Sequence, residues 1–192
     1  MAGTRFGGRT LARSQALQLL FQAEATGRTV ADVLEGEYAL DEGPLDPYAQ
    51  ELALGCDAML HEIDAVIGAT SANWSVSRMP AVDRNLLRLA LYEMLQVEAV
   101  DVAVAIDECV DLAKAYGTDE SSRFVNGLLG KVARRLEEGE DVVAQALEQM
   151  SAQGKEGEAE AEAADDELVE LARADAAVEV VPEDDLPEWA RG

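Results

Sequence analysis

Apolar side chains recur every three to four residues through most of residues 10–136, the period of α-helices that bury one face. We find no run that alternates between apolar and polar residues as a half-buried strand does. The sequence therefore predicts an all-α fold. The expected helices cover residues 10–25, a short segment after Thr29, residues 47–67, a helix opened by Pro80, and residues 102–116 and 120–136.

Capping residues mark the ends of these helices. Asp46 supplies a hydrogen-bond acceptor directly before Pro47, and proline suits the first helical position. Thr29 is followed three residues later by an acid, the spacing of a capping box. Either Thr118 or Asp119 is expected to cap the last helix.

The helix over residues 82–97 is apolar around most of its circumference, which predicts a place at the centre of a helical bundle. Glu93 falls within the apolar arc, so it is either a buried, paired acid or a contact for a protein partner. Cys109 lies on the core side of the next helix, where a thiol is inert, and His61 is expected on the surface. These residues do not predict catalysis, and no ligand cluster predicts a metal or cofactor.

The last helix combines a core stripe with an outward arc of unusual composition. That arc carries Arg123, Lys131, Arg134 and Arg135 beside two glycines, and Phe124 stands at its border with the core stripe. Single-stranded nucleic acid needs such a set, because a ring stacks bases, cations hold phosphates and glycine permits close approach. The alternative is that Phe124 turns inward and packs at the edge of the core.

The N-terminus is basic in an otherwise acidic chain. Arg5, Arg9 and Arg13 are spaced four residues apart, and no acid precedes Glu24. Arginine presents planar donors to phosphate and stacks on bases. The three arginines are therefore either a phosphate-binding stripe or solvated surface residues.

The net charge of −24 argues against generic polyanion binding. Residues 140–192 follow a domain over residues 1–139 and hold 3 basic and 17 acidic side chains, a net charge of −14. Their first part, to about Met150, could prolong the last helix, and the low-complexity stretch after it predicts a disordered tail. The tail is either a docking motif or a solvated extension, and its charge could also compete with RNA. No membrane span, signal peptide or disulfide framework is predicted, which favours a cytoplasmic protein.

Three blocks resemble the NusB family of transcription antitermination proteins. They are RTLARSQALQLLFQAE, WSVSRMPAVDRNLLRLALYEML and VAIDECVDLAKAYGTDESSRFVNGLLGKV, and they follow the family order over residues 9–136. The chain departs from the family pattern in its thinner basic N-terminus, in the acidic tail, and in Asp101 after Val100, where the family usually has proline.

The resemblance implies a bundle of about seven helices in two small subdomains and a role that is not enzymatic. It implies binding of boxA-type single-stranded RNA in nascent rRNA leaders, together with ribosomal protein NusE, on elongating RNA polymerase with other Nus factors. A protein adaptor with weak or no RNA binding is the alternative, and monomer and homodimer are both compatible. The family's RNA surface matches Arg5, Arg9, Arg13, Glu120, Arg123, Phe124 and Asn126, and its NusE surface matches Asp83 and Arg84.

Overall fold

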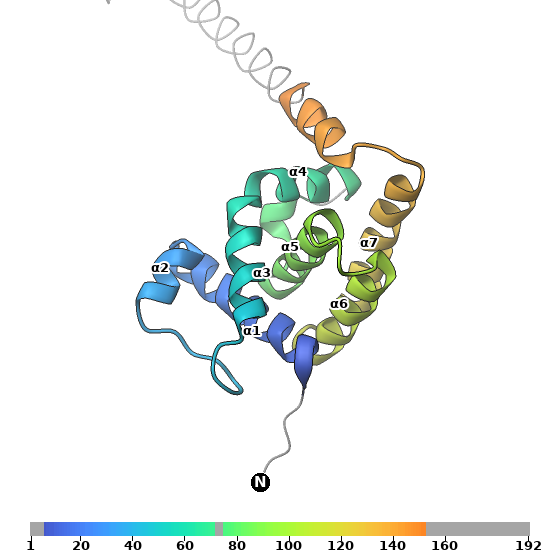
Figure 1. The fold of residues 1–192 in the computed structure, drawn as a ribbon. Coiled ribbons are helices and arrows are strands. Elements are labelled where there is room, and N and C mark those ends of the chain that lie inside the picture. The colour runs from blue at the N-terminus through green and yellow to red at the C-terminus, as the bar shows by residue number, and fades with distance from the viewer. Residues whose placement is uncertain (1–5, 72–74, 153–192) are drawn as a thin grey trace, which may run out of the picture. The chain divides into compact units, whose positions relative to one another are not determined.

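The computed structural model describes residues 6–71 and 75–152, nearly all of which belong to one compact unit, Met1–Met150. This part of the chain contains helices and no strand, so the predicted all-α fold is confirmed (Figure 1). The elements are α1 (Gly8–Thr26), α2 (Val30–Glu35), α3 (Pro47–Ala58), α4 (Leu60–Thr70), the 3₁₀ turn η1 (Val76–Arg78), α5 (Ala81–Gln96), α6 (Val102–Tyr116) and α7 (Ser121–Glu137). Residues 142–152 form a further helical segment.

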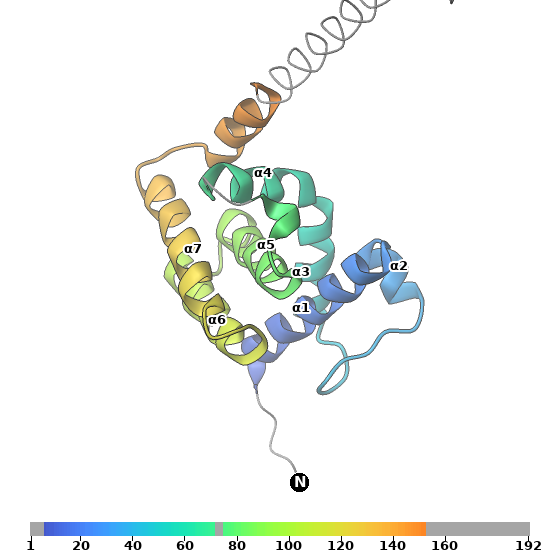
Figure 2. The same cartoon turned by 180° about the vertical axis from the view of Figure 1, so that it is seen from behind.

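Helix α5 runs through the centre of the unit. It contacts α1, α3, α4, α6 and α7, and its leucines Leu86, Leu87 and Leu91 are fully buried. Helices α1, α2 and α3 pack on one another on one side of α5, whereas α6 and α7 pair on the other (Figures 1 and 2). The central position predicted from the apolar circumference is confirmed.

Most predicted caps are present. Asp46 accepts the backbone N–H of Tyr48 at 2.8 Å, and Thr29 forms both bonds of the capping box that begins α2. Gly27 ends α1 with φ of 64°, a left-handed conformation that strongly favours glycine. These local features fix where α1 ends and where α2 and α3 begin.

Two predicted boundaries are wrong. The single helix expected over residues 47–67 is broken at Met59, where the chain turns between α3 and α4. Apolar periodicity hides the break because Cys56 before it and Ile63 after it are both buried in the same core. Thr118 does not cap α7; its backbone N–H instead donates to Ser121 Oγ at 2.8 Å, and Glu120 takes the N-cap position without a side-chain bond.

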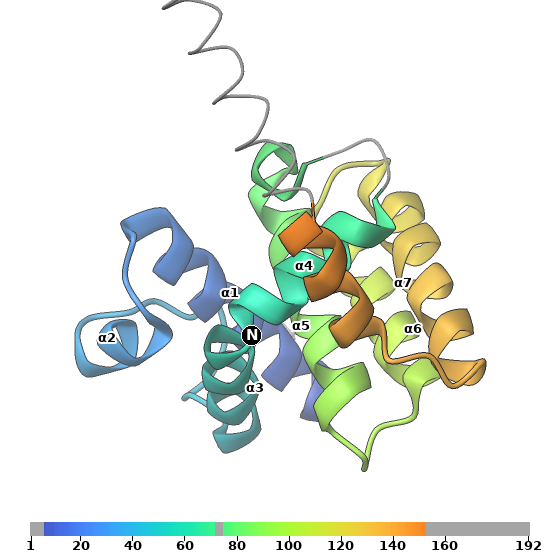
Figure 3. The same cartoon turned by 90° about the horizontal axis from the view of Figure 1, so that it is seen from above.

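The compact unit also extends beyond the predicted boundary at residue 139. The chain turns at Gly139, with φ of 77°, and the segment over residues 142–152 then buries Val142 and Ala146. Arg135 and Glu140 form an ion pair of 2.7 Å across the turn. Residues 140–150 therefore belong to the helical unit, beside α4 (Figure 3). The predicted disordered tail from residue 153 onward lies outside the described residues.

Candidate nucleic-acid and partner interfaces

Helix α7 separates a buried stripe from a cationic outward face. Arg123, Lys131 and Arg134 are exposed on that face, and the Arg123 side chain is 84% exposed. A Cβ atom at Gly127 or Gly130 would meet nothing within 4 Å, so the backbone between the cations is open. The opposite stripe, which packs on the core, consists of Val125, Leu128, Leu129 and Val132. Asn126 is also exposed.

The position of Phe124 is compatible with both of its predicted roles, base stacking and packing at the edge of the core. Its side chain is partly buried and packs against the core, and part of it stays accessible at the border of the outward face. It follows Arg123, which pairs with Glu120 at 3.3 Å on the exposed first turn of α7. Stacking of a base on Phe124 stays a prediction.

The start of α1 lies at the end of the bundle where α7 begins (Figure 2). The ring of Phe6 lies 6.1 Å from the ring of Tyr116, the last residue of α6 and a close neighbour of the α7 start in sequence. Arg9 is exposed, and its guanidinium carbon lies 5.2 Å from the centre of the Tyr48 ring. This cation–π contact restricts where Arg9 can point. Arg5 lies outside the described residues.

Arg13 does not share the surface of Arg9. Its side chain is 3% exposed, and its Nε donates to Glu93 Oε2 at 2.8 Å. The Nη1 group reaches Glu108 at 3.2 Å, and the Tyr48 hydroxyl donates to Glu93 Oε1 at 2.6 Å. The guanidinium of Arg13 therefore faces Glu93 and not the surface, because the turn of α1 carries Arg13 under Arg9 toward α5, and its RNA contact stays a prediction. Glu93 is the buried, paired acid.

The electrostatics of this buried cluster keep Arg13 charged and the Tyr48 hydroxyl protonated. Burial lowers the pKa of Arg13, but the hydrogen bond and charge of Glu93 raise it, and the increase prevails. Burial and the hydrogen bond to Glu93 raise the pKa of Tyr48, which keeps its hydroxyl protonated and donating. Since Arg9 stacks on the ring of Tyr48, the buried cluster also supports a surface cation.

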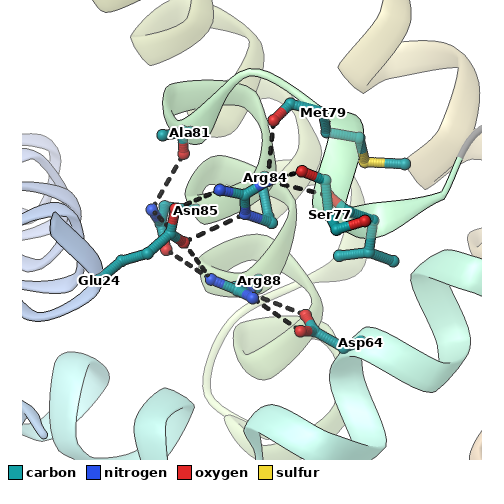
Figure 4. A network of polar contacts seen from close by, with 9 residues as sticks. Glu24, Asp64, Ser77, Met79, Ala81, Arg84, Asn85 and Arg88 are labelled. Carbon is teal, nitrogen blue, oxygen red and sulfur yellow. Dashed lines mark hydrogen bonds and ion pairs between the residues drawn. The ribbon is translucent and has the colours of Figure 1, made fainter. Parts of the chain in front are cut away.

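The start of α5 holds the two residues predicted to contact a protein partner. Arg84 Nη1 donates to the carbonyl oxygens of Met79 and Val76 at 2.8 and 2.9 Å, and Nε donates to Glu24 at 3.1 Å (Figure 4). Its donors thus point inward, which does not favour the predicted partner contact for Arg84. Asp83 is 5% exposed, and its Oδ1 has no hydrogen-bond partner in the described part of the chain.

The same network joins α1, α4 and α5. Arg88 donates to both carboxylate oxygens of Asp64, at 2.7 and 2.6 Å, and to Glu24 at 2.5 Å (Figure 4). Burial raises the pKa of Glu24, but the hydrogen bond from Arg84 and the charges of Arg84 and Arg88 lower it below the usual value. The ionised form of Glu24 is therefore stabilised by folding.

This shift predicts a pH-dependent stability. A lowered folded-state pKa contributes stability above the usual glutamate value of 4.5, and the contribution disappears as the pH falls through the folded-state pKa. We expect Glu24→Gln to unfold at lower urea than the parent at pH 7, and the two curves to converge under acid conditions. Glu35→Gln, on the exposed end of α2, is the control. A Glu24→Gln deficit that does not change with pH would contradict this assignment.

An apolar groove of about 390 Å³ lies along the outer side of α1. Phe21 lines it and is 41% exposed, which is unusual for a large aromatic side chain. The remaining lining comes from α1, the loop before α3, α5 and α6: Leu17, Gln18, Gln22, Ala39, Asp41, Val82 and Tyr116. The sequence did not predict this groove, because on a helical wheel Phe21 falls between Leu17 and Ser14, which are both buried.

Cys109 and His61 lie where the sequence predicted them, in the core and on the surface respectively. The Cys109 thiol is buried, donates to the Leu86 carbonyl oxygen at 3.2 Å, and has a pKa raised by burial. His61 is exposed on α4. Among the described residues, no group of three or more histidine, cysteine, aspartate or glutamate side chains could hold a metal ion. Over the same residues, no helix is both long and apolar enough to cross a membrane.

These features define an all-helical bundle whose exposed chemistry lies on a cationic helix face and in an apolar groove. The sequence profile of the NusB family matches residues 10–134. The transcription antitermination protein NusB of Salinispora tropica is 45% identical over 128 residues, which are 65% of this chain and 94% of that protein. The chain belongs to the NusB family, a family of transcription antitermination proteins.

Solved structures agree with this assignment. T. maritima NusB superimposes with a TM-score of 0.58 and 38% identity, over 67% of this chain and 92% of that one. A crystal structure of the antitermination factors NusB and NusE in complex with dsRNA matches with a TM-score of 0.55 and 26% identity, over 66% and 96% of the two chains. The NusB-like fold expected from the three sequence blocks is confirmed.

Proposed function

We propose that this chain binds boxA-type single-stranded RNA of nascent rRNA leader transcripts together with ribosomal protein NusE, as an antitermination factor on elongating RNA polymerase. The observation that carries the proposal is the outward face of α7. Residues 121–136 contain four basic side chains and no acid, in a chain with 39 acidic residues. The neighbouring NusB structure in complex with NusE and dsRNA supports the same role.

In this proposal the RNA contacts divide by chemistry. Arg9 and Arg123 hold phosphates, since both are exposed at the end of the bundle where α7 begins. Phe124 stacks a base, and the Asn126 amide offers both donors and acceptors to a base edge. Glu120 accepts from base N–H groups and gives up its exposed ion pair with Arg123 when a phosphate replaces it. Arg5 belongs to the same predicted set.

The groove beside α1 is the proposed NusE site. It is apolar, it exposes Phe21, and it reaches Val82 at the start of α5, where the family resemblance implied a NusE contact. Asp83 follows Val82 but is 5% exposed and does not line the groove, so its contact with NusE stays a prediction from the family resemblance. Exposed aromatic side chains such as Phe21 are enriched at the centres of protein interfaces.

In this proposal the affinity for RNA comes from two surfaces used together, the outward face of α7 and the groove beside α1. NusE bound at the groove adds its own RNA contacts, so RNA held by the cationic face gains from a raised effective concentration. Loading on RNA polymerase with other Nus factors follows from that ternary complex. A small number of exposed cations then suffices, which fits a chain with a net charge of −24.

The test is a titration of fluorescent boxA-type RNA with and without purified NusE, between about 50 and about 200 mM salt. We expect affinity to fall with salt and to rise with NusE. Arg9→Ala should weaken binding in both arms, whereas Phe21→Asp should remove only the gain from NusE. Arg28→Ala, which removes a cation beyond the other end of α1, is the charge-matched control. A stable NusE complex without salt-dependent RNA affinity would instead support the adaptor alternative.

A further inference from the structure

We propose that the RNA path on this chain continues along the outward face of α7 to Lys131 and Arg134. These residues lie beyond residues 124–127, the FVNG block. This inference rests on the proposed function and extends its binding site. The FVNG block ends at Gly127, so the extension adds a second half to the site, formed by the later turns of the same helix.

Lys131 and Arg134 are available for an external phosphate. Both are exposed, and neither takes part in an ion pair with the described residues. Arg135, by contrast, is tied to Glu140 at 2.7 Å and to Gln145 at 2.7 Å. Among the basic residues in the last turns of α7, Arg135 thus binds the helical segment over residues 142–152 and the turn before it. Lys131 and Arg134 face outward.

The spacing of this row suits an extended phosphate backbone. Positions 123, 127, 130 and 134 fall on one line of a helix with 3.6 residues per turn, and Arg123 and Arg134 lie about 16 Å apart along its axis. Lys131 stands beside that line. A compact ligand would bridge only neighbouring cations, whereas a single strand that follows the helix reaches all of them.

The two glycines on the line have no packing role within the described structure. A Cβ atom at either position would meet nothing within 4 Å, and glycine inside a helix is less stable than alanine. Open backbone between flanking cations lets a strand lie close against the helix. Continuity with Arg123 and Phe124 favours RNA over an acidic protein as the occupant.

The experiment compares the parent protein with Lys131→Ala/Arg134→Ala, using boxA-type RNA in the presence of NusE across a salt series. Each phosphate contact on a single strand contributes about 0.7 to the slope of log affinity against log salt, so we expect the slope to fall by about 1.4. The same RNA, shortened stepwise from either end, should reach a length at which parent and variant bind equally. Arg28→Ala/Arg78→Ala, which removes two exposed cations outside α7, controls for the loss of net charge.

A second variant separates binding from folding. Gly127→Gln/Gly130→Gln adds bulk in open space with a good helix former, so its melting temperature should rise while its RNA affinity falls. The inference is overturned if the parent binds RNA and both double variants bind with unchanged affinity and slope. If the parent itself does not bind RNA with NusE present, the proposed function fails, and the extension fails with it.

Discussion

Replacing Glu93 by alanine should lower the free energy of unfolding by about 3–5 kcal/mol, a large part of the stability of an ordinary domain. The carboxylate is 1% exposed and takes hydrogen bonds from Arg13 and from Tyr48. Its removal leaves a guanidinium that is 3% exposed with only Glu108, itself partly in water, as a counter-charge. Urea unfolding followed by circular dichroism measures the loss.

A matched pair on the surface provides the control. Glu120 and Arg123 form an ion pair with side chains 80% and 84% exposed, so Glu120→Ala should change stability by no more than about 1 kcal/mol. Replacing the whole buried pair, as Arg13→Met/Glu93→Leu, should recover much of the stability, because no uncompensated charge remains. A Glu93→Ala variant as stable as Glu120→Ala would show that the buried cluster does not hold α1 to α5.

The second large effect concerns Phe124 and RNA. Base stacking on an aromatic side chain contributes about 1–3 kcal/mol, so Phe124→Ala should weaken binding of boxA-type RNA by about 5-fold to 150-fold. Phe124→Leu tests the alternative role, because leucine keeps the apolar contact with the core and loses the ring. We expect Phe124→Leu to restore most of the stability but little of the RNA affinity. If Leu restores both equally, Phe124 is a packing residue and stacks no base.

The fold followed closely from local signals that act within a few residues. The Asp46–Pro47 start, the Thr29 capping box and the Gly27 stop all rest on hydrogen bonds between near neighbours. The central position of α5 followed from an apolar circumference, which leaves a helix no other stable location. The outward arc of α7 was also predictable, because the periodicity of the helix divides it cleanly into two faces.

The errors came from contacts between distant parts of the chain. The sequence predicts Arg13 as a surface cation, because its buried partner Glu93 is 80 residues away and the pairing is not visible locally. The two predictions were linked, since Glu93 in an apolar arc needed a buried cation. The break at Met59 does not interrupt the apolar periodicity of the sequence, because α3 and α4 on either side of it bury residues in the same core. Helix up to about Met150 was expected as a continuation of α7, whereas the structure places a turn at Gly139 before the segment that buries Val142 and Ala146.

The groove at Phe21 shows a different limit. A helical wheel places Phe21 between two buried positions of α1, and only the packed structure shows that Phe21 is exposed and that α5, α6 and the loop before α3 form a groove with it. Partner surfaces of this kind are assembled from several elements. Their residues therefore carry no common sequence pattern.

The most direct test of the central claim is an NMR titration of the isotope-labelled chain with boxA-type RNA. The account predicts that backbone amide shifts concentrate at Arg9 and along the outward face of α7, including the amides of Gly127 and Gly130. The amides of α2 and of the 142–152 segment should stay unchanged at the same RNA concentrations. Shifts confined to those segments, with α7 unaffected, would contradict the assignment of the RNA surface.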